Sequence, residues 1–320
     1  MSENLGEPHR YVIVGCGHAA VNTVNRLYLR KISAAVIIAI HADKQHLDMI
    51  HADTRILMGK SLAQGIGHRV DHDMGKRAAE KGRPVLERIF EPGDLVFIIT
   101  GLDDGIGTGS TPVIVQIAKN MGATVVGVIS FIDDRKHPTS QQWECINQIA
   151  EISDYFIPLN RNQLLNNYPE RKSNDGYQIG DLIISDSMKC IIDSITLPSL
   201  IPVQYSDFVS ILGFRGFNRI QLSEGSNQVD AETLVKNCLF PDSDPNVCTC
   251  ISSTLLYIIG GQDLTLTYCQ KIISLFIHEL NPQTPVISGA CIQEDMEGKV
   301  RLLAIMQITY PDPPDTGYLI

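Results

Sequence analysis

The stretch VFIITGLDDGIGTGSTPVIVQIAKNMGATVVGVI at residues 96–129 decides the fold class of this chain. An apolar, β-branched run leads into a glycine-rich turn, and a helical pattern then leads into a second apolar run. Pro112 suits the first turn of the expected helix, and Gly122 ends it. One face of that helix is apolar, lined by Val113, Ile117 and Met121. A strand, a helix and a strand in this order predict a parallel sheet covered by helices on both faces.

The same alternation continues along the chain. Further buried strands are expected at residues 10–17, 34–43, 94–102, 124–132 and 154–160. A helix is expected at residues 19–31, with an apolar face formed by Val21, Val24, Leu27 and Tyr28. The last part mixes strands and a helix, expected at residues 253–261, 263–280, 284–293 and 299–309. We therefore predict an α/β domain at 1–175, a long central helix at 176–198 and a smaller α+β domain at 199–320.

The composition excludes several classes of protein. The chain has 320 residues, and 26 Lys and Arg against 36 Asp and Glu give a net charge of −10. This acidic balance, without a basic cluster, argues against a nucleic-acid partner. No apolar run reaches the ~18 residues of a membrane span. The eight cysteines are spread out without a C-x-x-C pair, so we expect reduced, buried thiols in a cytoplasmic protein.

Two glycine-rich turns carry the expected chemistry. The first runs from Gly15 to Ala20 and the second from Gly105 to Ser110, and each lies between a strand and a helix. Glycine lets the backbone approach a phosphate closely, and a helix N-terminus favours its negative charge. The first turn alone also fits a dinucleotide-binding enzyme, with Asp43 as the ribose acid. Two such turns at two strand ends fit an ordinary dinucleotide fold poorly.

Five segments together resemble the tubulin/FtsZ superfamily, specifically its prokaryotic FtsZ branch: residues 12–27, 59–75, 96–129, 260–273 and 298–309. The second glycine turn resembles the GGGTGTG signature of that family, and the resemblance covers residues 11–309. It implies a parallel-sheet GTPase domain that binds GTP or GDP, with Mg²⁺ as a further candidate. It also implies head-to-tail filaments of this chain, in which one subunit completes the GTPase site of the next. Other FtsZ-like proteins are further candidate partners.

The resemblance implies a set of nucleotide-binding residues. At the phosphate end they are Gly15, Cys16, Gly17, His18, Asn22, Asp43, Arg69, Asp104, Gly105, Ile106, Gly107, Thr108 and Gly109. At the guanine end, Asp181 reads the base and Tyr177 stacks on it from the same helix face. Asn160 and Asn162 are both candidates for the base-contacting asparagine, and Asp134 is the candidate for the ribose contact.

The chain departs from the family at the phosphates. Asp103 and Asp104 replace the first two glycines of the signature, and Ile106 replaces its first threonine. Coulomb's law gives about 3 kcal/mol for one pair of like charges at ~5 Å and an effective dielectric constant of ~20. That cost vanishes if the carboxylates point away, bind Mg²⁺ or pair with a cation such as Arg69.

The expected catalytic loop also departs from the family. Only Asp207 is retained among its acids, because Gln204 replaces the first acid and Pro202 the asparagine. Glutamine can orient a water but cannot act as a general base at neutral pH. If the chain is an enzyme at all, we expect a slow GTPase completed between adjacent subunits. The alternatives are a scaffold that no longer needs nucleotide and, as a minor one, a dinucleotide-binding enzyme.

No metal-binding residues are predicted. Five of the nine histidines lie in one stretch: His41, His46, His51, His68 and His72. A metal site there is conceivable because His68 and His72 are four residues apart, but the segment between them is loop-like and has few acids nearby. The tail after Thr309 is short and proline-rich, whereas division proteins of the family usually continue to a peptide that binds membrane adaptors. We therefore expect no direct membrane binding and do not expect the role of the main division-ring protein.

Overall fold

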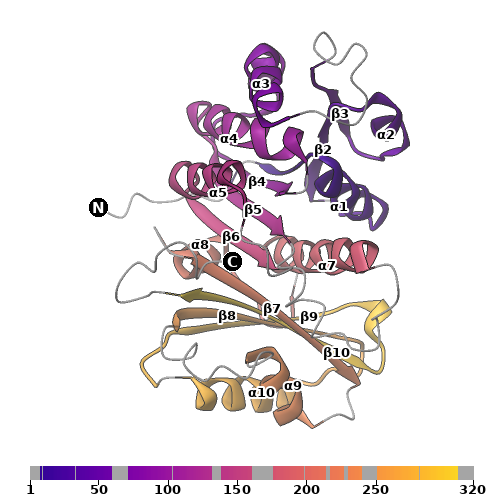
Figure 1. Cartoon of the computed structure of the whole chain (residues 1–320). Coiled ribbons are helices and arrows are strands. Elements are labelled where there is room, and N and C mark those ends of the chain that lie inside the picture. Colours follow the sequence, from indigo (N-terminus) through magenta and orange to yellow (C-terminus); the bar gives the residue numbers. More distant parts are fainter. Residues whose placement is uncertain are drawn as a thin grey trace. The chain divides into compact units, whose positions relative to one another are not determined.

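The computed structural model describes residues 8, 10–32, 34–59, 71–102, 104–131, 138–160, 176–197, 199–213, 217–226, 230–239, 251–280 and 282–308. The chain divides into two compact units, shown with their elements in Figure 1. The N-terminal unit consists of Pro8–Arg161 and Ile184–Asp186, and the C-terminal unit chiefly of Asn162–Ile183 and Ser187–Ile320.

The N-terminal unit is built on six parallel strands in the order β3-β2-β1-β4-β5-β6. Their bounds are Arg10–Cys16 (β1), Ala35–His41 (β2), Thr54–Leu57 (β3), Asp94–Gly101 (β4), Thr124–Phe131 (β5) and Tyr155–Asn160 (β6). The five strands that the apolar runs predict are confirmed. The strand β3 was not predicted, because it has four residues and none of them is fully buried.

The helices of this unit lie on both faces of the sheet. They are His18–Leu29 (α1), Lys44–Met49 (α2), His72–Leu86 (α3), Gly105–Asn120 (α4) and Ser140–Ile152 (α5), with a short 3₁₀ turn at Glu87–Ile89. Within the sheet, β2 lies on one side of β1, whereas β5 lies on the opposite side of β4, so the two connections run in opposite directions across the sheet. Since parallel crossovers are right-handed, α1 and α4 cover opposite faces, as Figure 1 shows.

The order in which strands are added to the sheet reverses between the parallel neighbours β1 and β4, and this reversal places the candidate site. These two strands are neighbours, and Gly15 and Cys16 at the end of β1 lie beside Ile99 and Thr100 of β4. In parallel α/β sheets, ligands bind outside the carboxyl ends of the strands at such a reversal. Both glycine-rich turns predicted from the sequence follow these two strand ends.

Two local predictions in this unit were wrong. The helix α4 begins at Gly105, so Gly105 to Ser110 form its first turns and Pro112 lies inside it. The helix begins earlier than predicted because the Asp104 side chain caps it at that point, so Pro112 does not mark its first turn. Tyr28 is 38% exposed and stacks on His51 at the surface, while Val21, Val24 and Leu27 are buried as expected. Gly122 ends α4 with a positive φ of 84°, as predicted.

The C-terminal unit contains a mixed four-stranded sheet in the order β7-β10-β8-β9. Its strands are Phe217–Ser226 (β7), Ile251–Gly260 (β8), Val286–Ile292 (β9) and Lys299–Ile308 (β10). The central strand β10 is antiparallel to β7 and β8, and β9 is parallel to β8. The strands β8, β9 and β10 were predicted, and β7 was not.

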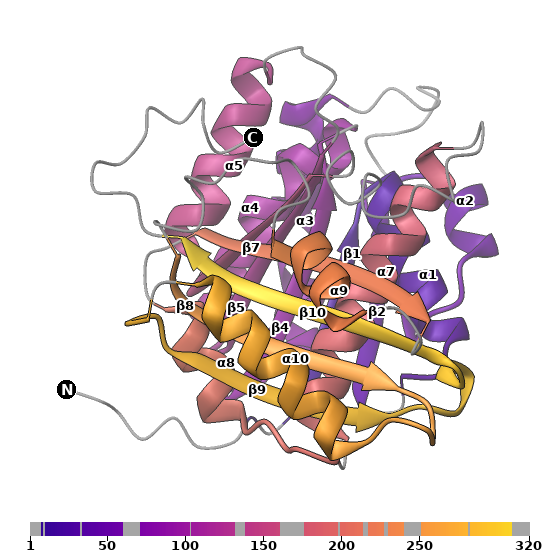
Figure 2. The ribbon, with the colours of Figure 1, turned by 90° about the horizontal axis from the view of Figure 1, so that it is seen from below.

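The helices of the C-terminal unit are Gly176–Thr196 (α7), Tyr205–Leu212 (α8), Ala231–Leu239 (α9) and Leu266–Glu279 (α10), with a 3₁₀ turn at Glu294–Met296. Figures 1 and 2 show α9 and α10 on one face of the four-stranded sheet, where they enclose an apolar core that includes Phe276 and Leu302. The helix α8 packs on β8 and β10. The division between the two units falls within α7. Among the described helices, none has the length and apolar character needed to cross a membrane.

Candidate functional site

Two helix N-termini meet at the reversal between β1 and β4. Gly17 caps α1 with a φ of 89°, a conformation that side chains other than glycine rarely adopt. A Cβ atom at Gly17 would lie 2.9 Å from the Cα of Gly107 in the first turn of α4. The amide groups at both helix starts therefore converge on one small region, which is an arrangement that binds anions.

The side chain of Asp104 already bridges the two helix starts. Its Oδ2 accepts a hydrogen bond from the backbone N–H of His18, and its Oδ1 accepts one from Gly107, both at 2.5 Å. Of the two acids that the sequence places beside the phosphates, Asp104 thus points inward, and Asp103 lies outside the described residues. The carboxylate takes two N–H donors that a phosphate would otherwise use.

The remaining residues of the second turn have mainly structural contacts. The Thr108 hydroxyl donates to the carbonyl of Asp104 at 3.0 Å, and Ile106 is buried. A Cβ atom at Gly109 would lie 1.9 Å from the carbonyl oxygen of His72 in α3. Gly109 is therefore required by the close packing of α3 on α4, a role that the resemblance to a phosphate loop did not suggest.

The first turn is also tightly packed. A Cβ atom at Gly15 would lie 2.6 Å from the carbonyl oxygen of Ala20, so glycine lets α1 approach β1. The thiol of Cys16 is buried and lies 2.9 Å from the hydroxyl of Ser110. Burial raises the pKa of Cys16 to about 11, so the thiol is neutral at physiological pH.

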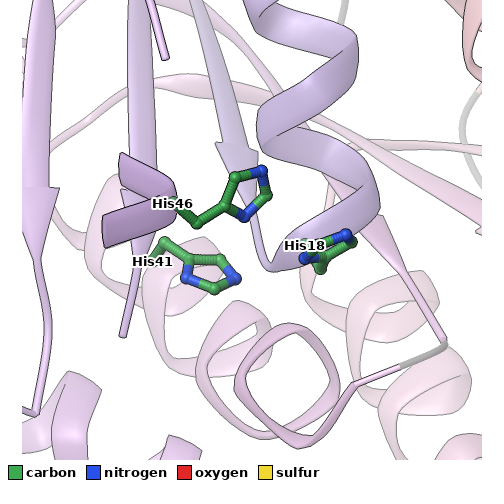
Figure 3. A group of neighbouring side chains, drawn as sticks. All are labelled: His18, His41 and His46. Carbon is green, nitrogen blue, oxygen red and sulfur yellow. The ribbon is translucent and has the colours of Figure 1, made fainter. Parts of the chain in front are cut away.

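Three histidines gather beside the start of α1. His18 opens α1, His41 ends β2 and His46 lies on α2, and Figure 3 shows their rings grouped together. One ring nitrogen from each lies within 4.8 Å of those of the other two. His18 was predicted as a nucleotide-binding residue. His41 and His46 belong to the histidine-rich stretch 41–72, which was not predicted to bind a metal, because the sequence alone does not show that His18 lies beside it.

Two further predicted residues hold this cluster. Asn22 Oδ1 lies 3.0 Å from Nε2 of His46. The Asp43 carboxylate caps α2 by accepting the N–H groups of Gln45 and His46, and the Asp43 N–H donates to Nδ1 of His41 at 2.8 Å. Asp43 thus orients the start of α2 in addition to any contact with a ligand.

His41 and His46 favour the neutral form. Burial is the largest cause of the lowered pKa of His41 and of His46, and the neighbouring His18 lowers both further. The carboxylates of Asp104 and Asp43 act in the opposite direction but are outweighed. Both imidazoles are therefore uncharged at neutral pH.

The predicted residues of the C-terminal unit lie on two helices. Asp181 is buried on α7. Gln204 precedes α8, and its backbone N–H donates to the Asp207 carboxylate at 3.0 Å. The retained acid of the predicted catalytic loop is therefore part of a helix cap. Arg69, Asp134 and Asn162 lie outside the described residues, as do the side chains of Asn160 and Tyr177.

Family models match both units of the chain. "Tubulin/FtsZ family, GTPase domain" matches residues 10–169, and "FtsZ family, C-terminal domain" matches residues 219–308. Cell division protein FtsZ 2 of Halobacterium salinarum is 39% identical over 306 residues, covering 95% of this chain and 77% of that protein. The FtsZ 2 protein of Methanocaldococcus jannaschii is 36% identical over 315 residues, covering 96% and 81%.

Solved structures show the same fold. An empty FtsZ dimer of M. jannaschii superposes with a TM-score of 0.84 at 27% identity, covering 95% of this chain and 89% of that one. A GTPγS-bound protofilament of CetZ2 from Haloferax volcanii gives a TM-score of 0.72 at 16% identity, covering 93% and 92%. The second likeness concerns the fold alone.

Proposed function

Because the chain belongs to the tubulin/FtsZ family, we propose that it is a guanine-nucleotide-binding, filament-forming protein of cell division. The observation that carries this proposal is the meeting of the α1 and α4 N-termini at the reversal between β1 and β4. The family's GTPase domain binds GTP or GDP, and the phosphates would lie against Gly17 and Gly107. Asp181 on α7 would read the guanine edge.

The partner of each subunit is a further copy of the chain, placed head to tail. The start of α8, with Gln204 and Asp207, would then reach the nucleotide of the adjoining subunit. We expect slow hydrolysis there, because Asp207 is held in a helix cap and Gln204 cannot take a proton from water. Other FtsZ-like chains are further candidate partners. The six described cysteines, all free and buried, support a reducing, cytoplasmic location.

Bound nucleotide is the direct test of this function. The purified chain is denatured and the released nucleotides are separated by chromatography, with a GTP-dependent pelleting assay alongside. We expect GDP or GTP in the wild type and pelleting that Asp181→Ala abolishes. Glu232→Ala, at an exposed position of α9, is the matched control and should behave like the wild type. Absence of bound nucleotide, together with no GTP binding in the presence of Mg²⁺, would contradict the proposal.

One observation favours a second function, a scaffold that assembles without nucleotide. The Asp104 carboxylate already satisfies the amides of His18 and Gly107, so the helix starts are stable without a phosphate. A scaffold of this kind would pellet equally with and without GTP, and Asp181→Ala would leave its pelleting unchanged.

A further inference from the structure

The ring nitrogens of His18, His41 and His46 form a convergent set of metal-ligand atoms. They lie within 4.8 Å of one another, and the His18 and His46 ring centroids are 4.3 Å apart (Figure 3). Two ring nitrogens of these histidines, Nε2 of His41 and Nδ1 of His46, are buried without a hydrogen-bond partner. A buried polar atom without a partner is costly, and a bound cation would remove that cost. We infer that these three histidines bind a divalent transition-metal ion such as Zn²⁺.

His46 is already oriented as a ligand. Its Nε2 faces the Asn22 Oδ1 atom at 3.0 Å, and an amide oxygen can only accept. The proton of the neutral ring is therefore on Nε2, which leaves the lone pair of Nδ1 directed at the other two rings. Histidine ligands of metals are commonly held in this way, with the second ring nitrogen donating to an oxygen.

His41 has to change its tautomer to bind the ion. Its Nδ1 accepts the Asp43 N–H, so the neutral ring carries its proton on Nε2. Binding through Nε2 moves that proton to Nδ1 and releases the Asp43 amide. Because Asp43 caps α2 and α2 carries His46, metal binding is expected to alter the start of this helix.

The ring of His18 has to move toward the other two rings to complete the metal site. Tetrahedral Zn²⁺ with Zn–N bonds of about 2.05 Å brings ligand nitrogens to roughly 3.3 Å from one another. His18 is exposed, so its ring can rotate toward the other two, while its backbone N–H stays on Asp104. Three protein ligands leave a fourth position for water.

The surroundings suit a soft divalent cation. Imidazole ligands favour Zn²⁺, Cu²⁺ or Ni²⁺ over Mg²⁺, which prefers oxygen. The carboxylates of Asp104 and Asp43 lie beside the cluster, where they accept the backbone N–H groups of His18 and His46, so their negative charge favours a bound cation.

Titration with Zn²⁺ alone tests the site independently of nucleotide binding. The full chain, freed of metal and nucleotide, is titrated in a calorimeter beside His18→Asn, His41→Asn and His46→Gln. Asparagine at position 41 can still accept the Asp43 N–H, and glutamine at position 46 can still reach Asn22. The control is His51→Asn, since His51 is exposed, bonds to Asn25 and is not part of the cluster. Circular dichroism confirms that each variant is folded.

We expect one Zn²⁺ per chain, at least ten-fold weaker binding in each cluster variant and unchanged binding in the control. Co²⁺ should give the strong visible bands of a four-coordinate site, without thiolate charge-transfer absorption. The same spectrum is expected for the Cys248→Ser/Cys250→Ser variant, which removes the one Cys-x-Cys pair of the sequence and so excludes a thiolate site there. Amide exchange at Asp43 should accelerate on metal binding. Equal affinity in wild type and cluster variants, or loss of binding only in the cysteine variant, would overturn the inference. If His41→Asn fails to fold, the Zn²⁺ affinities of the His18 and His46 variants, whose positions are less buried, test the inference.

Discussion

At the scale of single residues, we expect Asp104 to determine how the proposed phosphate region responds to a nucleotide. Its carboxylate bonds to the amides of His18 and Gly107 at 2.5 Å, so a phosphate must displace it and tolerate its charge. We predict that Asp104→Gly raises the affinity for GDP at least ~10-fold, since about 1.4 kcal/mol of relieved repulsion corresponds to a factor of ten. Calorimetric titration with GDP and Mg²⁺ measures the change.

The same substitution should lower stability. Replacing the N-cap carboxylate by glycine costs roughly 0.3 kcal/mol for the cap, and losing the hydrogen bond from the His18 N–H adds about 1 kcal/mol. Urea unfolding of the nucleotide-free chain would detect this loss. Asp104→Ser is the matched control, because serine can still cap α4 but carries no charge. It should gain affinity and lose less stability. Weaker GDP binding in both variants would show that the carboxylate assists the nucleotide, for example through a cation.

The buried histidines predict a specific dependence of stability on pH. Folding lowers the pKa of His41 and His46 below the ordinary value of 6.5. Between the folded pKa and 6.5 the unfolded chain binds more protons, so the free energy of unfolding is highest above pH 6.5 and falls as the pH drops below it. Urea unfolding in a chelator at about pH 7.5 and about pH 5.5 measures this loss.

A double variant isolates the contribution of these two rings. His41→Asn/His46→Gln should lose less stability on acidification than the wild type, because neither position can bind a proton. His51→Asn, at an exposed position, should lose as much as the wild type. An identical loss in the double variant would assign the effect to carboxylates elsewhere in the chain.

At the scale of elements, the packing of α3 on α4 depends on glycine. A Cβ atom at Gly109 would meet the backbone oxygen of His72 at 1.9 Å, and backbone cannot rotate away. We predict that Gly109→Ala lowers the free energy of unfolding by roughly 2–4 kcal/mol, which chemical denaturation would measure. Gly82→Ala in α3 is the control, since its Cβ would have only ordinary contacts, the nearest at 3.7 Å. It should be neutral or stabilise by up to ~1 kcal/mol.

Apart from β3 and β7, the strands were predicted from the sequence, as were α1, α4, α7 and α10, because a buried element has a regular apolar pattern. The helices α3 and α5 were not predicted. The apolar runs of β1, β2 and β4 are continuous, since helices cover both faces of the sheet. The start of α4 was not predictable from Pro112, because the cap at Asp104 is stabilised by the distant His18 amide. The histidine cluster was not predicted as a metal site, because only the pairing of β1 with β2 brings His18 close to His41 and His46.

At the scale of the whole molecule, the proposed function depends on assembly. A GTPase site completed by the next subunit gives a rate per chain that rises with protein concentration, as filaments form. In the proposed reaction, the start of α8 is expected to slow hydrolysis, because Gln204 stands where the family resemblance expects an acid and Asp207 accepts the N–H of Gln204. Only one carboxylate is then left to polarise the attacking water.

A second carboxylate at position 204 should therefore raise the rate of GTP hydrolysis. We predict that Gln204→Asp raises the rate of phosphate release by about 10²-fold, the lower range for a positioned general base. Gln204→Asn is the control, since it shortens the side chain in the same way without adding a base, and it should leave the rate low. Phosphate release is measured over a series of protein concentrations, with pelleting in parallel. Equal rates in Gln204→Asp and Gln204→Asn, at matched filament mass, would mean that hydrolysis is limited by Asp104 and the phosphate region instead of by α8.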